Sequence, residues 1–264
     1  MQFIDSHSHI DFPEFKGETK SILKKAADAG VSNIVVSATT AKRWHNIKAL
    51  VSEHQGCFAA YGLHPMFMDE YRPKQLDDLK AMIKAEKPIA VGEVGLDYFI
   101  KLNDEEQNKK DQLRLFVAQL ELASEFNLPV IIHARKSLDL VLKELRTFPQ
   151  LSGSIHSFSG SEQQAKQLID LGFYLGFGGP ITYTRATRLR KLVTSLPLDS
   201  LLLETDSPDQ PDSTHYGERN EPSYLPTIAA VIAQLRGVDI EIIADVTTTN
   251  AQKLFNFGSN KLKQ

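Results

Sequence analysis

Short apolar segments alternate with longer amphipathic segments along the whole chain, and this alternation limits the possible folds more than any other feature. The apolar segments are predicted strands: Phe3–Ser6, Asn33–Ala38, Phe58–Gly62, Ile89–Gly92, Val130–His133, Gly153–Phe158, Phe173–Gly178 and Leu201–Thr205. The predicted helices are Lys20–Ala29, Ala41–His54, Lys74–Glu86, Asp104–Phe126, Leu138–Thr147, Ser161–Leu171 and Thr187–Ser195, with a further helical region over Pro226–Phe255. Alternating strands and helices form parallel β-α units, and eight such units predict an α/β fold of the closed (β/α)8 TIM-barrel type. A doubly wound open sheet is the alternative.

The composition is that of a globular protein, with 42% hydrophobic and 24% charged residues among 264. Because no linker or change of composition divides the sequence, we expect one barrel domain over residues 1–264. A net charge of −3 argues against a protein that coats nucleic acid, so any phosphate recognition must be local.

The sequence also limits where the protein acts. No apolar run approaches the roughly 18 residues of a membrane span, and the start lacks the basic and apolar parts of a signal peptide. The single cysteine, Cys57, cannot form an internal disulfide, which favours a reducing compartment. We therefore expect a cytoplasmic protein without membrane association, and no obligate protein partner is evident.

Side chains that bind divalent metal ions stand at the carboxyl ends of five predicted strands. Alternation along a strand puts both histidines of an His-x-His pair on one face, and the carboxyl ends of barrel strands meet at one mouth. Each residue alone has an ordinary explanation: a surface histidine, a core histidine or a helix-capping glutamate. Carboxylates near a barrel axis are costly to bury unless they are paired or coordinated. Together the residues predict a metal site at this mouth: His7, His9, Glu93, His133, His156 and Asp206.

Two further carboxylates lie one layer deeper in the predicted barrel. Asp5 and Glu204 each stand two residues before a candidate ligand and therefore share its face. Each is either a buried carboxylate held by other groups or an acceptor that orients a ligand histidine from the second coordination sphere.

Other polar residues near the mouth are candidates for substrate contact. His64 follows the third strand and either contacts substrate or forms a local hydrogen bond beside Pro65. Arg135 shares the face of His133 by alternation. Arg185 and Arg188 belong to a basic cluster after the seventh strand, which is either a solvated helix face or a seat for phosphates.

Several ordered motifs make the chain resemble the TatD-family metal-dependent hydrolases of the amidohydrolase-type TIM barrels, over essentially its full length. They begin at Phe3, Gly62, Gly92, Leu128, Ile155 and Glu204 and read FIDSHSH, GLHP, GEVGLDY, LPVIIH, IHSFSG and ETDSP. The chain looks closest to the less characterised branch of that family. It departs from the usual pattern at Met66, where a second histidine is common, and at Lys253, where arginine is more common.

The resemblance implies divalent metal binding and, from characterised relatives, 3′→5′ DNase activity. It suggests that one ion is held by His7, His9, Glu93 and Asp206, and a second by Glu93, His133 and His156, with Glu93 bridging. Mixed nitrogen and oxygen ligands suit zinc, manganese or iron, whereas so many imidazoles disfavour magnesium.

The expected chemistry is hydrolysis by an activated water, with Glu93 and Asp206 as catalytic residues and Asp206 accepting the proton. DNA or a small phosphoester is the expected substrate. The Met66 departure leaves open a different substrate on the same ions, namely a small phosphoester, lactone or amide. The alternative that is not an enzyme is a catalytically silent barrel that serves as a metal-binding scaffold.

Overall fold

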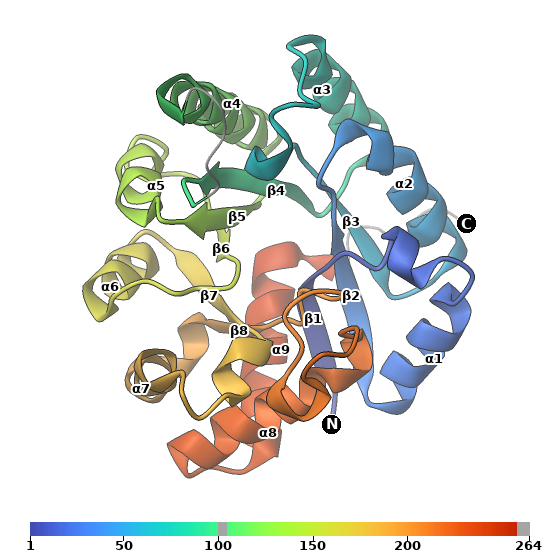
Figure 1. Cartoon of the computed structure of the whole chain (residues 1–264), viewed down its shortest axis with the longest axis vertical. Helices are drawn as coiled ribbons and strands as arrows, with labels where there is room; N and C mark the ends of the chain where they lie inside the picture. The colour runs from blue at the N-terminus through green and yellow to red at the C-terminus, as the bar shows by residue number, and fades with distance from the viewer. Residues whose placement is uncertain (100–104, 258–264) are drawn as a thin grey trace.

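The computed structural model describes residues 1–99 and 105–257, and its centre is a single sheet of parallel strands (Figure 1). The strands pair in sequence order as β1(Phe3–Ser8), β2(Val31–Ser37), β3(Cys57–Tyr61), β4(Ala90–Asp97), β5(Val130–Arg135), β6(Gly153–Ile155), β7(Phe173–Phe177) and β8(Leu201–Leu203). Apolar and β-branched runs such as Val130–Ile132 favour strands that are buried on both faces.

The ends of this sheet meet, so the strands form a barrel. The Asp206 N–H donates to the carbonyl of His7 over 2.9 Å, and the His9 N–H donates to the carbonyl of Ser207 over 2.7 Å. These hydrogen bonds join β1 to the segment that continues β8. The predicted (β/α)8 barrel is confirmed, and the doubly wound open sheet is excluded.

Helices surround the barrel, as Figure 1 shows. Their bounds are α1(Thr19–Asp28), α2(Trp44–Glu53), α3(Lys74–Glu86), α4(Glu105–Phe126), α5(Leu138–Leu145), α6(Glu162–Asp170), α7(Thr187–Ser195), α8(Leu225–Arg236) and α9(Ile240–Phe255). The predicted helical region Pro226–Phe255 is thus two helices, because Gly237 adopts a left-handed φ of 66° that ends α8. Residue 104, the predicted start of the fourth helix, lies outside the described residues.

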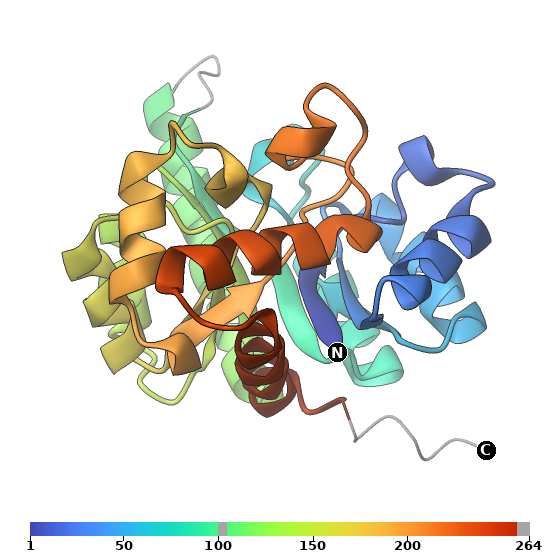
Figure 2. The same ribbon diagram turned by 90° about the horizontal axis from the view of Figure 1, so that it is seen from below.

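The amino-terminal end of the barrel is filled by apolar side chains. Ile4, Val35, Ile131 and Leu202 pack there with residues of α9, including Leu254. Figure 2 shows α9 lying at this end, opposite the loop that follows β8. The polar mouth is therefore the carboxyl-terminal end, where barrel enzymes place their sites.

Strand β4 extends to Asp97, five residues past the end expected from the sequence. Its pairing with β5 shifts register between Val91 and Val94, so Glu93 lies at an irregularity inside the strand. The apolar run that marks a strand in a sequence stops before such polar residues, although the backbone pairing continues. Among the described residues, no helix is both long and apolar enough to cross a membrane.

Candidate metal centre

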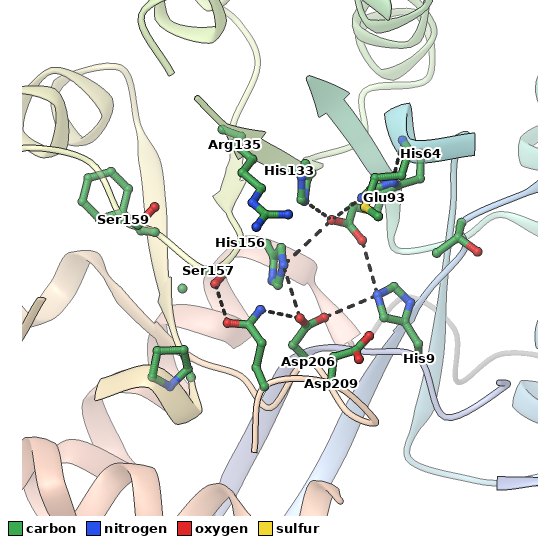
Figure 3. A pocket seen from close by; sticks show the side chains of 18 of the residues that line it. His9, His64, Glu93, His133, Arg135, His156, Ser157, Ser159, Asp206 and Asp209 are labelled. Atoms are coloured by element: carbon green, nitrogen blue, oxygen red, sulfur yellow. Dashed lines mark hydrogen bonds and ion pairs between the residues drawn. The ribbon is translucent and has the colours of Figure 1, made fainter. Parts of the chain in front are cut away.

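The structure brings the predicted ligand residues together at the carboxyl-terminal mouth. They border a cavity of about 640 Å³ whose wall includes His9, Glu93, His133, His156 and Asp206 (Figure 3). His7 lies beneath that wall and is fully buried. Residues separated by up to 199 positions in the sequence therefore share one small volume.

Four of these residues form a compact group of donor atoms. The Nε2 atoms of His7 and His9 lie 3.2 Å apart, and they lie 3.2 and 3.4 Å from Glu93 Oε2. The same two nitrogens lie 3.4 and 3.5 Å from Asp206 Oδ1. Donor atoms at the usual 2.0–2.1 Å from a tetrahedral zinc ion would lie roughly 3.3 Å apart. The His7, His9 and Glu93 atoms are therefore spaced like ligands of one divalent cation, and Asp206 forms a further such group with His7 and His156.

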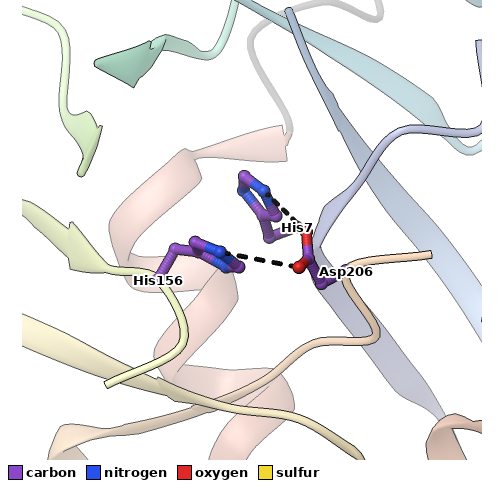
Figure 4. Close-up of side chains that lie close together, drawn as sticks. All are labelled: His7, His156 and Asp206. Carbon is purple, nitrogen blue, oxygen red and sulfur yellow. Dashed lines mark ion pairs between the residues drawn. The ribbon is translucent and has the colours of Figure 1, made fainter. Parts of the chain in front are cut away.

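A second group of donors lies on the other side of Glu93. Glu93 Oε1 is 3.2 Å from His133 Nδ1 and 3.9 Å from His156 Nε2. His156 Nε2 lies 3.8 Å from Asp206 Oδ2, and Figure 4 shows Asp206 to one side of the stacked rings of His7 and His156, in contact with both. This group is more open than the first, and Glu93 and Asp206 each direct one oxygen toward each group.

The electrostatics of the centre depend on burial and on mutual pairing. Burial lowers the pKa of His7, but Glu93 and Asp206 outweigh it and raise that pKa from 6.5 to about 9. Burial raises the pKa of Glu93 and of Asp206, but the surrounding histidines hold both well below their usual range. The positive charge of protonated histidines thus balances the negative charge of the carboxylates. A cation that enters the site would replace those protons.

Three ligand rings are held by a contact to the second nitrogen. Ser37 serves two rings, because its carbonyl oxygen lies 2.8 Å from His9 Nδ1 and its hydroxyl lies 3.1 Å from His7 Nδ1. Asp97 Oδ2 lies 3.0 Å from His133 Nε2. Such contacts select the tautomer and fix the direction of a metal-binding ring.

Glu204 lies beside the fourth ring. Its Oε1 lies 3.1 Å from His156 Nδ1 and accepts a hydrogen bond from the Ser157 N–H over 2.6 Å. Asp5 does not play the corresponding part, since its carboxylate accepts hydrogen bonds from the hydroxyl and N–H of Thr205 at 2.6 and 2.9 Å. Asp5 thereby ties β1 to the chain after β8, and among the described residues it contacts no ligand ring.

Local backbone geometry explains why these side chains converge. A Cβ on Gly62 would lie 2.7 Å from the carbonyl carbon of Gly92, so only glycine lets β3 come this close to the chain at Glu93. Asp206 adopts a left-handed φ of 59°, a conformation that aspartate tolerates better than most residues. Such backbone conformations gather at functional sites.

His64 lies in the cavity wall but is oriented for hydrogen bonding. Its Nδ1 accepts from the Met66 N–H over 3.1 Å, so the neutral ring carries its proton on Nε2. That Nε2 lies 3.1 Å from Glu93 Oε1 and donates to it. Burial lowers the pKa of His64 to about 4. The ring is therefore a neutral donor, and this tautomer leaves no nitrogen lone pair for a metal.

The predicted basic residues divide into two groups. Arg135 lines the cavity, as expected from alternation along β5. Arg185 and Arg188 are not among the residues that line it. Arg185 stacks over Tyr183 at 5.0 Å, and Arg188 donates to the carbonyl of Ser159 over 2.6 Å.

Two residues of the site were not assigned a role from the sequence. Asp97 follows Glu93 by four positions in a strand and shares its face, which is a signal that alternation could have supplied. Gln210 donates to Asp206 Oδ2 over 2.5 Å and accepts from the Ser157 hydroxyl over 3.0 Å. Its position depends on the conformation of the loop after β8, which carries no such periodic signal.

The fold and the site together define a class: a (β/α)8 barrel with histidine and carboxylate donors for divalent cations at its carboxyl-terminal mouth. A family model described as TatD related DNase matches residues 4–256. The chain belongs to this TatD family.

Individual relatives are similar to this protein in sequence or structure over nearly the whole chain. It is 40% identical over 259 residues to the Escherichia coli K12 protein named Uncharacterized metal-dependent hydrolase YjjV, covering 97% of this chain and 98% of that protein. It is 34% identical to Uncharacterized metal-dependent hydrolase YabD of Bacillus subtilis 168, covering 95% and 98%. The crystal structure of the Escherichia coli TatD homolog YjjV superposes with a TM-score of 0.90 at 39% identity, covering 96% of this chain and 98% of that one.

Proposed function

We propose that this protein is a metal-dependent phosphodiesterase that acts on DNA with 3′→5′ polarity. The observation that carries the proposal is the bridging position of Glu93, whose two oxygens face two separate groups of histidine donors. Family membership and the name of the matching family support the choice of DNA as substrate.

The donor atoms suggest two divalent cations, zinc, manganese or iron by ligand chemistry. The first would be held by His7, His9, Glu93 and Asp206, and the second by Glu93, His133 and His156. When bound, two such ions lower the pKa of water and stabilise negative charge on the attacking and leaving oxygens.

Asp206 is the proposed proton acceptor. The histidines around it keep its pKa well below the usual range, so the carboxylate is ionised at neutral pH. Gln210 holds Oδ2 at the cavity wall through a 2.5 Å hydrogen bond. A water that loses its proton to Asp206 attacks phosphorus, the ester P–O bond breaks, and the leaving oxygen takes up a proton.

The cavity wall supplies groups that recognise the substrate. Arg135 offers a guanidinium group, which binds phosphate oxygens through two parallel hydrogen bonds. His64 stays neutral and holds Glu93 in place through its Nε2 proton. Arg135 thus brings positive charge to the cavity, although the chain as a whole has a net charge of −3.

A substrate panel tests this proposal. Metal-loaded protein is assayed on 3′-labelled single-stranded DNA, bis(p-nitrophenyl) phosphate, a lactone and an amide. We expect release of nucleotides and cleavage of the small phosphodiester, both lost in His156→Ala and retained in His45→Ala, which alters an exposed histidine on α2. Hydrolysis of the lactone or amide alone would replace the phosphodiester assignment with the alternative substrate class.

A further inference from the structure

Beside the candidate metal centre, a partly exposed aromatic ring lies against two cations. Phe99, two residues after β4, has 47% of its surface exposed. The guanidinium carbon of Arg135 lies 3.7 Å from the centre of the ring, and Lys136 Nζ lies 4.7 Å from it. We call Phe99, Arg135 and Lys136 the ring–cation cluster. An exposed ring of this kind leaves apolar surface in contact with water. Binding of a ligand would remove that surface from water.

The backbone after β5 is shaped so that consecutive cations reach the same ring. Consecutive residues of a strand point to opposite faces. Lys136 instead adopts a left-handed φ of 54°, a conformation that costs a lysine side chain energy. This turn ends the alternation and brings both Arg135 and Lys136 over Phe99.

The ring–cation cluster is joined directly to a candidate metal ligand. The Phe99 N–H donates to Asp97 Oδ1 over 2.9 Å, while Asp97 Oδ2 lies 3.0 Å from His133 Nε2. One carboxylate therefore holds both the backbone of Phe99 and a ligand imidazole. Figure 3 shows Arg135 reaching into the cavity toward His156.

The two cations lack acidic partners within the described part of the chain. Neither Arg135 nor Lys136 forms an ion pair there, whereas other surface lysines pair with nearby carboxylates, such as Lys24 with Asp28 at 2.7 Å and Lys80 with Glu125 at 2.7 Å. Arg135 lines the cavity and Lys136 follows it in the chain, and neighbouring cations without acidic partners there are suited to an anionic ligand. An aromatic ring beside them, with 47% of its residue surface exposed, suits a ligand that also has a flat, stackable part.

We propose that the ring–cation cluster binds the nucleotide next to the cleaved bond in single-stranded nucleic acid, with its base against Phe99 and its phosphate at Lys136 and Arg135. This inference rests on the proposed phosphodiesterase function and assigns the residues that would hold the nucleotide beside the cleaved bond. Bases in a duplex are already stacked on one another, so their faces are not free to contact Phe99.

Binding is measured by fluorescence anisotropy with labelled single-stranded and duplex DNA, using metal-free protein so that no cleavage occurs. We expect Phe99→Leu to weaken binding of the single strand about 5-fold or more and to leave duplex binding unchanged. We expect Lys136→Gln to lower the slope of log affinity against log salt by about 0.7, the value for one phosphate contact on a single strand. The matched controls on α9, Ile242→Ala and Lys253→Gln, should bind as the wild type does.

Hydrolysis of bis(p-nitrophenyl) phosphate by the metal-loaded proteins separates this inference from the proposed function. This small diester lacks a neighbouring nucleotide, so any drop in its hydrolysis by Phe99→Leu should be much smaller than the loss in DNA binding. If the wild type cleaves it and both variants bind single-stranded DNA with wild-type affinity and salt slope, the ring–cation cluster is not a nucleotide subsite. If the wild type cleaves neither this diester nor DNA, the phosphodiesterase function and the subsite both fail.

Discussion

Replacing Glu93 with glutamine in the metal-free protein tests the electrostatics of the centre directly. Glu93 Oε2 lies 3.2 Å from His7 Nε2, and this carboxylate is a main reason that the pKa of His7 rises from 6.5 to about 9. A group whose pKa is raised on folding stabilises the fold fully below its unfolded value, here 6.5, and that contribution is lost as the pH rises through about 9. At pH 7 the raised pKa of His7 corresponds to about 3 kcal/mol.

Asp206 remains in the variant and retains part of this effect, so we expect Glu93→Gln to lower the free energy of unfolding at pH 7 by roughly 1–3 kcal/mol. The assay is urea unfolding of chelator-treated protein, followed by circular dichroism at pH 7 and at pH 10. The difference from the wild type should shrink or reverse at pH 10, where His7 is mostly neutral. Glu53→Gln, an exposed change on α2, is the control. A difference that stays equal at both pH values would refute the reasoning.

Three further predictions follow from the same geometry. Binding of zinc at pH 7.5 should release at least one proton, because the pKa of His7 is raised to about 9 in the metal-free protein; calorimetry in buffers of different ionisation enthalpy measures this, and the absence of proton release would contradict it. Asp97→Asn should weaken metal affinity about 10–100-fold with an unchanged circular dichroism spectrum, since Asp97 orients His133. Competition with a chromogenic chelator measures the affinity, and a wild-type value would show that Asp97 does not orient the ligand. Asp206→Asn should retain most of the metal but lower kcat by about 10²–10⁴-fold, and full turnover would exclude Asp206 as proton acceptor.

The sequence predicts the barrel and the convergence of the donors because both follow from periodicity. Alternation places His7 and His9 on one face, and their Nε2 atoms lie 3.2 Å apart. The carboxyl ends of parallel strands meet wherever the sheet closes, so Glu93 and His156 become neighbours without any local signal linking them.

Features that depend on loop conformation or on a single proton are not visible in the sequence. The tautomer of His64 is decided by the Met66 N–H, and Gln210 reaches Asp206 because of the path of the loop after β8. The hydrogen bond from Arg188 to the carbonyl of Ser159 likewise depends on where the loop after β6 runs. Periodic patterns place residues on faces, but they do not fix the turns that follow a strand.

Metal stoichiometry tests the central claim most directly. Protein purified in the presence of zinc and freed of excess ion is analysed by inductively coupled plasma mass spectrometry, with wild type, Glu93→Ala and the control Glu53→Gln in parallel. Two equivalents per chain are expected in the wild type and control, and fewer than one in Glu93→Ala, because its carboxylate faces both groups of donors. Two equivalents retained in folded Glu93→Ala, or none in the wild type, would contradict the account.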